Sequence, residues 1–329
     1  MSGINFAIYI LCIGLSGAGA WLVGRYGHRF DLMDHPNDRS SHRDTTPKGG
    51  GIGILAGFLA SALILKLPGF FWIPAVMLSV LSFVGDRYHL SPIIRLIFQF
   101  TASFIFLFGL WNTLPYSSIG YLLMIPVSLY IVGTTNYYNF MDGINGLAAI
   151  TGVVGFALLA FYGSYSGNSS ALTPINICFV LCCIGFLPYN FPNAKVFLGD
   201  VGSILLGFVF ALMVVWYSTS LKDFLCLTSF LFPFYADEIT TELIRLKDGE
   251  KLWEPHRRHL YQILANEYGI AHWKVSLGYG IAQLFVGASI LYILRLGLST
   301  VVAVFFLYLV VFSVISLGLR KRLTQTTGI

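Results

Sequence analysis

The chain alternates between long apolar stretches and short polar segments, and this pattern limits its possible folds more than any other feature. A helix needs about 20 mostly apolar residues to cross a bilayer, and eleven stretches approach or reach that length. They span residues 4–24, 51–66, 70–85, 93–111, 118–135, 146–163, 172–189, 201–218, 224–240, 275–294 and 299–319. Charged residues make up only 11% of the chain, against about 25% in soluble proteins. We therefore predict an all-α polytopic membrane protein, a single transmembrane domain over residues 1–329 with about 11 helices, and not a soluble enzyme.

The polar segments are of two kinds that alternate along the chain. One kind is short and nearly free of charge, whereas the other is rich in charge, histidine and asparagine. Of the 20 Lys and Arg residues, only Lys66, Lys222 and Arg295 fall in the first kind. Since cytoplasmic loops carry the excess of Lys and Arg, we predict a periplasmic N-terminus and a cytoplasmic C-terminus. The predicted active-site loops are then the cytoplasmic segments at about 25–50, 86–92, 136–145, 190–200 and 242–274.

The first charge-rich segment ends in three glycines, Gly49 to Gly51, that open the next helix. Backbone N–H groups in such a run can approach an anion, and Arg43 and Lys48 add positive charge nearby. The same glycines also suit a flexible linker and close helix packing. The sequence leaves both interpretations open.

Carboxylates and amides recur at the predicted membrane boundary. Asp86 ends one apolar stretch, where it has either a structural role as a cap or a functional one. Asn136, Asn139 and Asp142 are three residues apart and would line one face of a helix end. Asp200 opens the stretch at 201–218, where it suits either an N-cap or a ligand of Mg²⁺.

The last long polar segment contains two His and two Arg in four residues, His256, Arg257, Arg258 and His259. Such a cluster is typical of pyrophosphate recognition. It would also bind anionic lipid headgroups, and the spacing of the two His residues allows Zn²⁺. Together, the segments predict a phosphoryl-transfer site that takes one substrate from the bilayer and the other from the cytosol. The net charge of +5 is too small to indicate binding of nucleic acid.

These segments, in this order, resemble those of the polyprenyl-phosphate N-acetylhexosamine-1-phosphate transferases. The resemblance runs from about Asp34 to Gln262, with its most specific part in residues 139–146 and 197–203, and it is closest to the branch that initiates O-antigen. It implies transfer of an N-acetylamino-sugar 1-phosphate from a UDP-sugar to undecaprenyl phosphate, with release of UMP. It also implies Mg²⁺, or Mn²⁺, as cofactor, a place in the bacterial inner membrane, and a role in making lipopolysaccharide or a related glycan. The oligomeric state, a homodimer included, stays open.

The resemblance also implies roles for single residues. Asp200 would be the principal Mg²⁺ ligand with Asn145 as a second ligand, Asp86 and Asp142 would join Asp200 as catalytic carboxylates, and Phe197 would stack on uracil. The remaining predicted substrate-binding residues are Arg43, Lys48, Asn136, Asn139, Asn145, Asn190, His256, Arg257, Arg258 and His259. Gly85 departs from the family, which usually has an aspartate there, and Asn145 stands where the family's translocase has a second Asp.

The favoured mechanism is direct attack by the lipid phosphate, which is largely dianionic near neutral pH because its second pKa is about 6. A two-step route through an aspartyl-phosphate at Asp142 or Asp86 is the alternative. A transporter or flippase for lipid-linked sugars is the alternative function, although transporters place polar groups near the bilayer midplane. A CDP-alcohol phosphotransferase would need an Asp-Gly-x-x-Ala-Arg run, which Asp142 and Gly143 do not begin.

Overall fold

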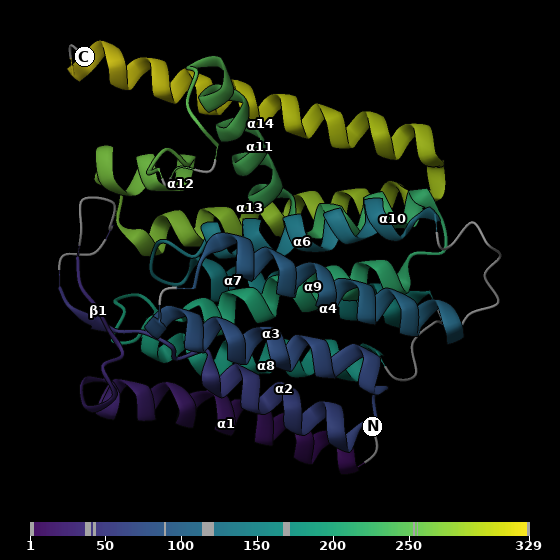
Figure 1. The fold of residues 1–329 in the computed structure, drawn as a ribbon. Helices are drawn as coiled ribbons and strands as arrows, with labels where there is room; N and C mark the ends of the chain where they lie inside the picture. The colour runs from purple at the N-terminus through teal and green to yellow at the C-terminus, as the bar shows by residue number, and fades with distance from the viewer. Residues whose placement is uncertain are drawn as a thin grey trace.

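A computed structural model describes residues 3–36, 41, 44–88, 90–113, 122–166, 172–252, 254 and 256–327. The described chain is almost entirely helical, and its long helices form one bundle (Figure 1). The helices are α1 (Gly3–Tyr26), α2 (Ile52–Ile64), α3 (Gly69–Tyr88), α4 (Pro92–Thr113), α6 (Met124–Phe140), α7 (Leu147–Tyr165), α8 (Leu172–Asn190), α9 (Asp200–Tyr217), α10 (Leu221–Thr228), α11 (Phe232–Lys247), α12 (Leu260–Gln262), α13 (His272–Ile293) and α14 (Leu298–Thr327). Two short strands, β1 (Met33–Asp34) and β2 (Thr46–Pro47), pair antiparallel.

Eight of the described helices are long and apolar enough to cross a membrane. They are α1, α3, α4, α7, α8, α9, α13 and α14. The helix α2 is shorter, with 13 residues, and α6 has 17. The prediction of an all-α polytopic membrane protein is confirmed, whereas the count of eleven spans and the orientation stay predictions.

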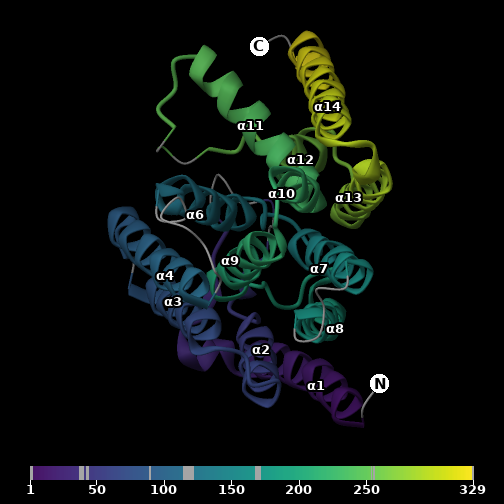
Figure 2. The ribbon, with the colours of Figure 1, turned by 90° about the vertical axis from the view of Figure 1, so that its right-hand side faces the viewer.

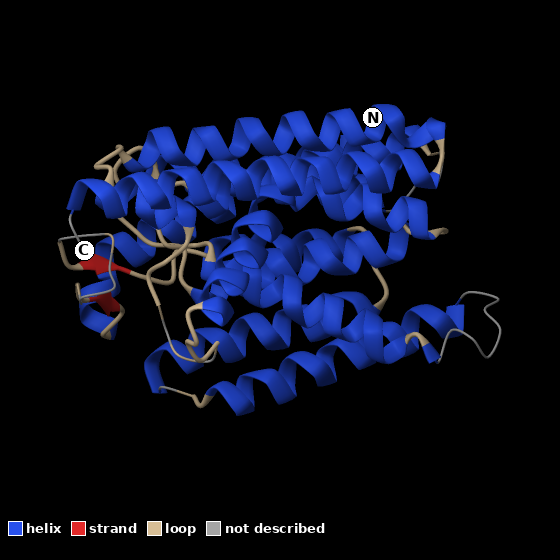
Figure 3. Cartoon of the chain, turned by 90° about the horizontal axis from the view of Figure 1, so that it is seen from above, coloured by secondary structure: helices blue, strands red, loops and turns tan. Residues whose placement is uncertain are grey.

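The charge-rich segments gather at one end of the bundle, which we call the loop end. The strands, α12 and the connections that precede α7 and α9 lie there, at the left of Figure 1 and again at the left of Figure 3. The C-terminus is also at the loop end, and the N-terminus is at the opposite end (Figure 1). The alternation of charge-rich and charge-poor segments therefore corresponds to the two ends of the bundle.

The helix α6 extends further than the sequence predicted. The expected boundary was residue 135, but α6 continues to Phe140 and includes Asn136 and Asn139. The amide nitrogen of Asn136 donates to the carbonyl of Val132 inside the helix and to Gln99 of α4, both at 2.8 Å. Because these groups bond to its side chain, Asn136 can lie within α6.

The helix α11 also passes its predicted end, at residue 240, and continues to Lys247. Its polar residues Asp237, Glu238 and Arg245 are at most 2% exposed. The guanidinium of Arg245 bonds to Glu250 and to three carbonyl groups of the following loop. The sequence pattern predicted that the residues after 240 are exposed to solvent, but Arg245 is buried and bonds to protein groups instead.

The helix α9 lies inside the bundle, with α3, α4, α6, α7 and α2 around it (Figure 2). Of its membrane-length segment 83% is buried, against 11% for α14. A helix that is apolar on every face suits a protein core or a membrane, and α9 lies in the core of the bundle. Because α9 is packed on all sides, the position of its first residue, Asp200, at the loop end is fixed.

Glycines allow the start of α2 to contact α9. A Cβ atom at Gly51 would lie 2.4 Å from the Cα of Gly202, so neither position accepts a side chain. The N–H groups of Gly49 and Gly50 both donate to the carbonyl of Phe197, at 3.2 and 2.9 Å. Because these N–H groups are used within the protein, the interpretation of the glycine run as an anion-binding loop is wrong, and the alternative of close packing is confirmed.

Candidate active site

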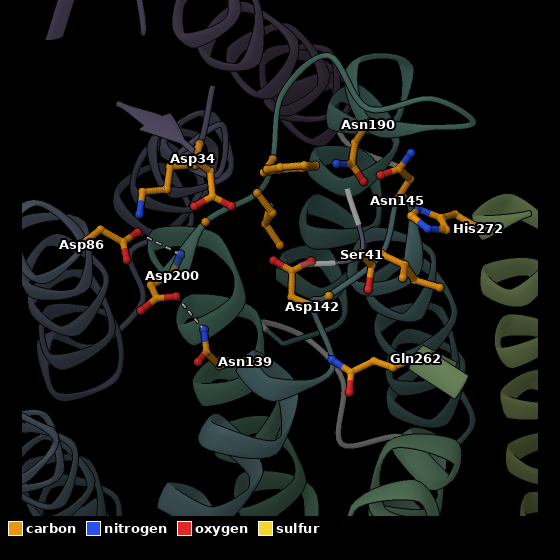
Figure 4. A pocket seen from close by; sticks show the side chains of 16 residues that line it. Asp34, Ser41, Asp86, Asn139, Asp142, Asn145, Asn190, Asp200, Gln262 and His272 are labelled. Atoms are coloured by element: carbon orange, nitrogen blue, oxygen red, sulfur yellow. Dashed lines mark hydrogen bonds between the residues drawn. The ribbon is translucent and has the colours of Figure 1, made fainter. Parts of the chain in front are cut away.

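A cavity of about 280 Å³ opens at the loop end (Figure 4). Its lining comes from β1, the turn before α2, the ends of α3 and α6, the connections that precede α7 and α9, and the α12–α13 region. Eight of the predicted site residues line it, namely Lys48, Asp86, Asn139, Asp142, Asn145, Asn190, Phe197 and Asp200. The fold therefore brings segments that are far apart in the sequence to one place.

Two carboxylates, Asp86 and Asp200, lie side by side at one end of this cavity (Figure 4). The N–H group of Asp200 donates to the carboxylate of Asp86 at 3.3 Å. Asp200 is the first residue of α9, and the N-cap is Gly199 with a φ of 72°, so the alternative of Asp200 as N-cap is wrong. The carboxylate of Asp86 instead lies at the positive end of the α9 dipole, which stabilises negative charge.

The carboxylate of Asp200 has two side-chain partners. Asn139, on the last turn of α6, donates to it at 2.9 Å, and Arg95 of α4 pairs with it at 2.6 Å. The Nε of Arg95 is buried and has no hydrogen-bond partner among the described residues, which leaves one further donor beside the carboxylates. Arg95 was missed in the sequence, although a charge inside an apolar stretch is costly and usually functional.

Asp142 follows α6 and lies between the two ends of the cavity (Figure 4). Burial raises the pKa of Asp142 well above its usual value, and the neighbouring charges of Asp200 and Asp86 raise it further. Like charges around one cavity favour either a bound cation or protonation of one carboxyl group.

The pair Asp86 and Asp200 suits a divalent cation. Across the described ranges, no three His, Cys, Asp or Glu side chains lie close enough together to hold a metal ion. Mg²⁺ typically takes one or two carboxylates and completes its shell with water and substrate phosphates, so a pair of carboxylates fits that ion. Asn145 lies at the opposite end of the cavity from Asp200 (Figure 4), so the structure does not bring these two predicted ligands together.

Amide side chains and a histidine lie at that opposite end, where Figure 4 labels Asn145, Asn190 and His272. The amide oxygen of Asn190 accepts from the N–H group of Gly146 at 2.7 Å, and its nitrogen donates to the carbonyl of Val196 at 2.9 Å. Asn190 therefore joins the turn before α7 to the loop before α9. Both groups of this amide are used within the protein, so Asn190 shapes this end of the cavity.

The four residues of the His–Arg cluster, which were predicted to bind substrate, do not line the cavity. Arg257 pairs with Glu267 at 2.9 Å, and Arg258 pairs with Asp248 at 2.5 Å and also with Glu250. These ion pairs compete with any phosphate for the two guanidinium groups.

The two histidines of the cluster also lie away from the cavity lining, with ring centroids 4.7 Å apart. Burial lowers the pKa of His256 to about 4, assisted by the charge of His259, and lowers the pKa of His259 to about 3, assisted by Arg320 and Arg245. Both rings are therefore neutral near pH 7. Among the other predicted residues, Asn136 is bonded to Gln99, and Arg43 lies outside the described residues.

Eight further residues line the cavity, and four of these have polar side chains: Asp34, Ser41, Gln262 and His272. Asp34 and Ser41 belong to the first charge-rich segment, and Gln262 ends the His–Arg motif, so each had a signal in a segment already singled out. His272 lies in the predicted active-site loop 242–274 but belongs to no motif there, so only the fold shows that it lines the cavity.

Residues 69–218, which include Asp86, Asp142 and Asp200, match glycosyl transferase family 4. The chain is 32% identical over 290 residues to the undecaprenyl-phosphate alpha-N-acetylglucosaminyl 1-phosphate transferase of Thermotoga maritima, with 87% of each chain covered. It is 29% identical over 300 residues to the decaprenyl-phosphate N-acetylglucosaminephosphotransferase of Mycobacterium leprae, with 78% of this chain and 75% of the relative covered. It is 28% identical over 267 residues to a probable undecaprenyl-phosphate N-acetylglucosaminyl 1-phosphate transferase of Bacillus subtilis, with 76% and 74% covered. The chain therefore belongs to glycosyl transferase family 4, among the polyprenyl-phosphate N-acetylhexosamine-1-phosphate transferases.

Proposed function

We propose that the protein transfers an N-acetylamino-sugar 1-phosphate from a UDP-sugar to undecaprenyl phosphate, giving undecaprenyl-diphospho-sugar and UMP. The single observation that carries this proposal is the composition of the cavity. Carboxylates with Arg95 and Lys48 lie at or near one end, amide groups lie at the other, and apolar helices surround the whole. These groups would suit the phosphates of a nucleotide sugar and of a lipid acceptor.

In the proposed reaction, an oxygen of the acceptor phosphate attacks the phosphorus that carries the sugar, and the bond from this phosphorus to UMP breaks. The attacking phosphate is already largely dianionic near neutral pH, so no strong base is needed. The site has to offset the charge of the phosphates and hold them in line. A divalent cation at Asp86 and Asp200 would supply charge neutralisation when bound.

The protein's own residues supply the rest. Asn139 orients the carboxylate of Asp200, and Arg95 and Lys48 add positive charge at that end. Phe197, which lines the cavity, would stack on the uracil ring. Direct attack is the mechanism we favour, and formation of an aspartyl-phosphate at Asp142 or Asp86 is the alternative.

We place the reaction at the cytoplasmic face of a bacterial inner membrane. The distribution of Lys and Arg supports this orientation, because the loop end carries nearly all of them. The product would begin a cell-surface polysaccharide, such as O-antigen or a related glycan. The relatives act, by their names, on N-acetylglucosamine, so UDP-N-acetylglucosamine is the first donor to test.

The alternative of a transporter or flippase finds less support. Transporters bind substrate near the bilayer midplane, whereas the residues that line this cavity come from the loop end of the bundle. Membership of a transferase family also favours the transfer reaction.

The test is an assay of purified protein with undecaprenyl phosphate, Mg²⁺ and a panel of UDP-N-acetylamino sugars. We expect release of UMP that requires the lipid acceptor, ceases with EDTA and returns with Mg²⁺ or Mn²⁺. Failure to release UMP with every donor would refute the proposed reaction. Release of UMP without acceptor, abolished by Asp142→Asn, would instead support the covalent route.

A further inference from the structure

A buried carboxylate outside the cavity holds the segment that contains α12. Asp237 of α11 is 0% exposed and accepts backbone hydrogen bonds from Leu260 at 2.7 Å and Tyr261 at 3.2 Å. It also accepts from the hydroxyl groups of Tyr279 at 2.7 Å and Thr241 at 3.2 Å. A buried carboxylate is costly without such partners. The Thr241 bond lies within α11, and the other three fix the first residues of α12 relative to α11 and α13.

Tyr261 connects this fixed segment to the catalytic side of the cavity. Its side chain is 0% exposed, and its hydroxyl donates to the carbonyl of Phe140 at 2.9 Å. Phe140 is the last residue of α6, so this bond satisfies one of the carbonyls that a helix C-terminus leaves unpaired. A Cβ atom at Gly143 would lie 2.1 Å from the same hydroxyl, which shows that the ring contacts the residue next to Asp142.

The residue after Tyr261 is Gln262, which lines the cavity. Its amide oxygen accepts from the N–H group of His259 at 3.3 Å, which ties Gln262 to the start of α12. Figure 4 labels Gln262 and Asp142 in the same view of the cavity. The segment 260–262 therefore contributes Gln262 to the cavity lining, and through Tyr261 it also contacts the turn that carries Asp142.

We propose that Tyr261 is a positioning residue for the transfer reaction: anchored by Asp237, its hydroxyl and ring hold the turn that carries Asp142. This inference rests on the proposed function, since it concerns the rate of that reaction. Tyr261 touches the backbone around Asp142 and lies outside the cavity lining, so its effect is on geometry.

The opposite end of the bundle offers a matched control. Tyr217 is 1% exposed, its hydroxyl is hydrogen-bonded to Asn176 at 3.1 Å, and a Cβ atom at Gly163 would lie 2.5 Å from that hydroxyl. Tyr217 therefore repeats the same arrangement, a buried hydroxyl against a glycine, far from the cavity.

The experiment compares Tyr261→Phe with Tyr217→Phe in the full-length protein, with kcat, KM for each substrate and Tm as readouts. A buried hydrogen bond is typically worth about 1 kcal/mol, so we expect kcat of Tyr261→Phe to fall about 3- to 10-fold with little change in KM. Tyr217→Phe should lose similar thermal stability and keep its kcat. Equal kcat values for the two variants would overturn the inference, whereas an inactive wild-type protein would refute the proposed function instead.

A second pair of substitutions tests the contact itself. Gly143→Ala places a methyl group against the Tyr261 hydroxyl and should lower kcat. Because Tyr261→Phe removes the atom that clashes, the double variant should be no slower than Gly143→Ala alone. Losses that simply multiply in the double variant would show that the ring and the turn act independently, and would contradict the proposal. Gly163→Ala, with and without Tyr217→Phe, is the control and should leave kcat unchanged.

Discussion

The side chain of Asp200 unites the features expected of the principal metal ligand. It opens α9, lies beside Asp86, and is oriented by Asn139 and Arg95. Asp200→Asn keeps the shape of this group and removes its charge. We expect turnover to fall by about 100- to 1,000-fold or more, as for other charge-stabilising groups in active sites. UMP release at saturating Mg²⁺ measures the effect.

A control for Asp200→Asn exists at the other end of the bundle. Asp223 accepts hydrogen bonds from Thr219 and Ser220 near the start of α10, so Asp223→Asn also removes a hydrogen-bonded carboxylate. It should leave turnover unchanged. Near-normal activity of Asp200→Asn would show that the metal assignment is wrong.

Phe197 is the aromatic residue in the cavity lining, and the substitution Phe197→Ala tests whether its ring binds the donor. Stacking of a base on an aromatic ring is worth about 1–3 kcal/mol, so KM for the UDP-sugar should rise by roughly 5- to 150-fold. KM for the lipid acceptor should change little, and Phe197→Tyr should retain donor binding. If KM for the donor stays the same in Phe197→Ala, the ring only packs against its neighbours.

At the scale of the element, the segment 256–262 is sensitive to acid. The pKa of His256 is lowered to about 4 by burial, against about 6.5 for an unfolded histidine. Between these values the unfolded chain binds a proton that the folded protein does not, so stability falls as the pH drops from about 6.5 toward 4. We expect Tm to fall between pH 7 and pH 5, and to fall less in His256→Gln. The same drop in both proteins would mean that His256 titrates freely when folded.

The sequence predicted the helices well and their polar ends poorly. Length and hydropathy identified a stretch such as 201–218 because the whole of α9 is apolar. They ended α6 and α11 too early because Asn136 and Glu242 look like loop residues until their partners are known. Gln99 and Tyr137, which supply those partners, come from other helices.

The candidate site was likewise predicted in part. Asp86, Asp142 and Asp200 were identified because acidic residues at membrane boundaries are rare and costly. The His–Arg cluster was singled out for its charge, but its charged members pair with Asp248, Glu250 and Glu267. Which residue of that segment reaches the cavity depends on how α12 is anchored, and composition carries no information on that.

At the scale of the whole molecule, the orientation can be tested by labelling. The five native cysteines are buried, so a single introduced cysteine should give a clear signal. Lys251, with a side chain 62% exposed, lies in the loop-end segment after α11, and the exposed Ser166 follows α7 at the other end. We expect an impermeant reagent to label Lys251→Cys only from the cytoplasmic side and Ser166→Cys only from the periplasmic side. The reverse pattern would place the cavity outside the cell and remove its source of UDP-sugar.

The backbone pairing of Lys48 with Phe197 bears on how the protein is made. A chain is synthesised from its N-terminus, so the glycines after Lys48 enter the membrane long before the carbonyl groups that they bond. Contacts between such distant residues form late in folding. A chain that the ribosome releases before α9 is made lacks both Phe197 and Asp200. Such a fragment is expected to be inert, so interrupted synthesis would leave no partly active transferase.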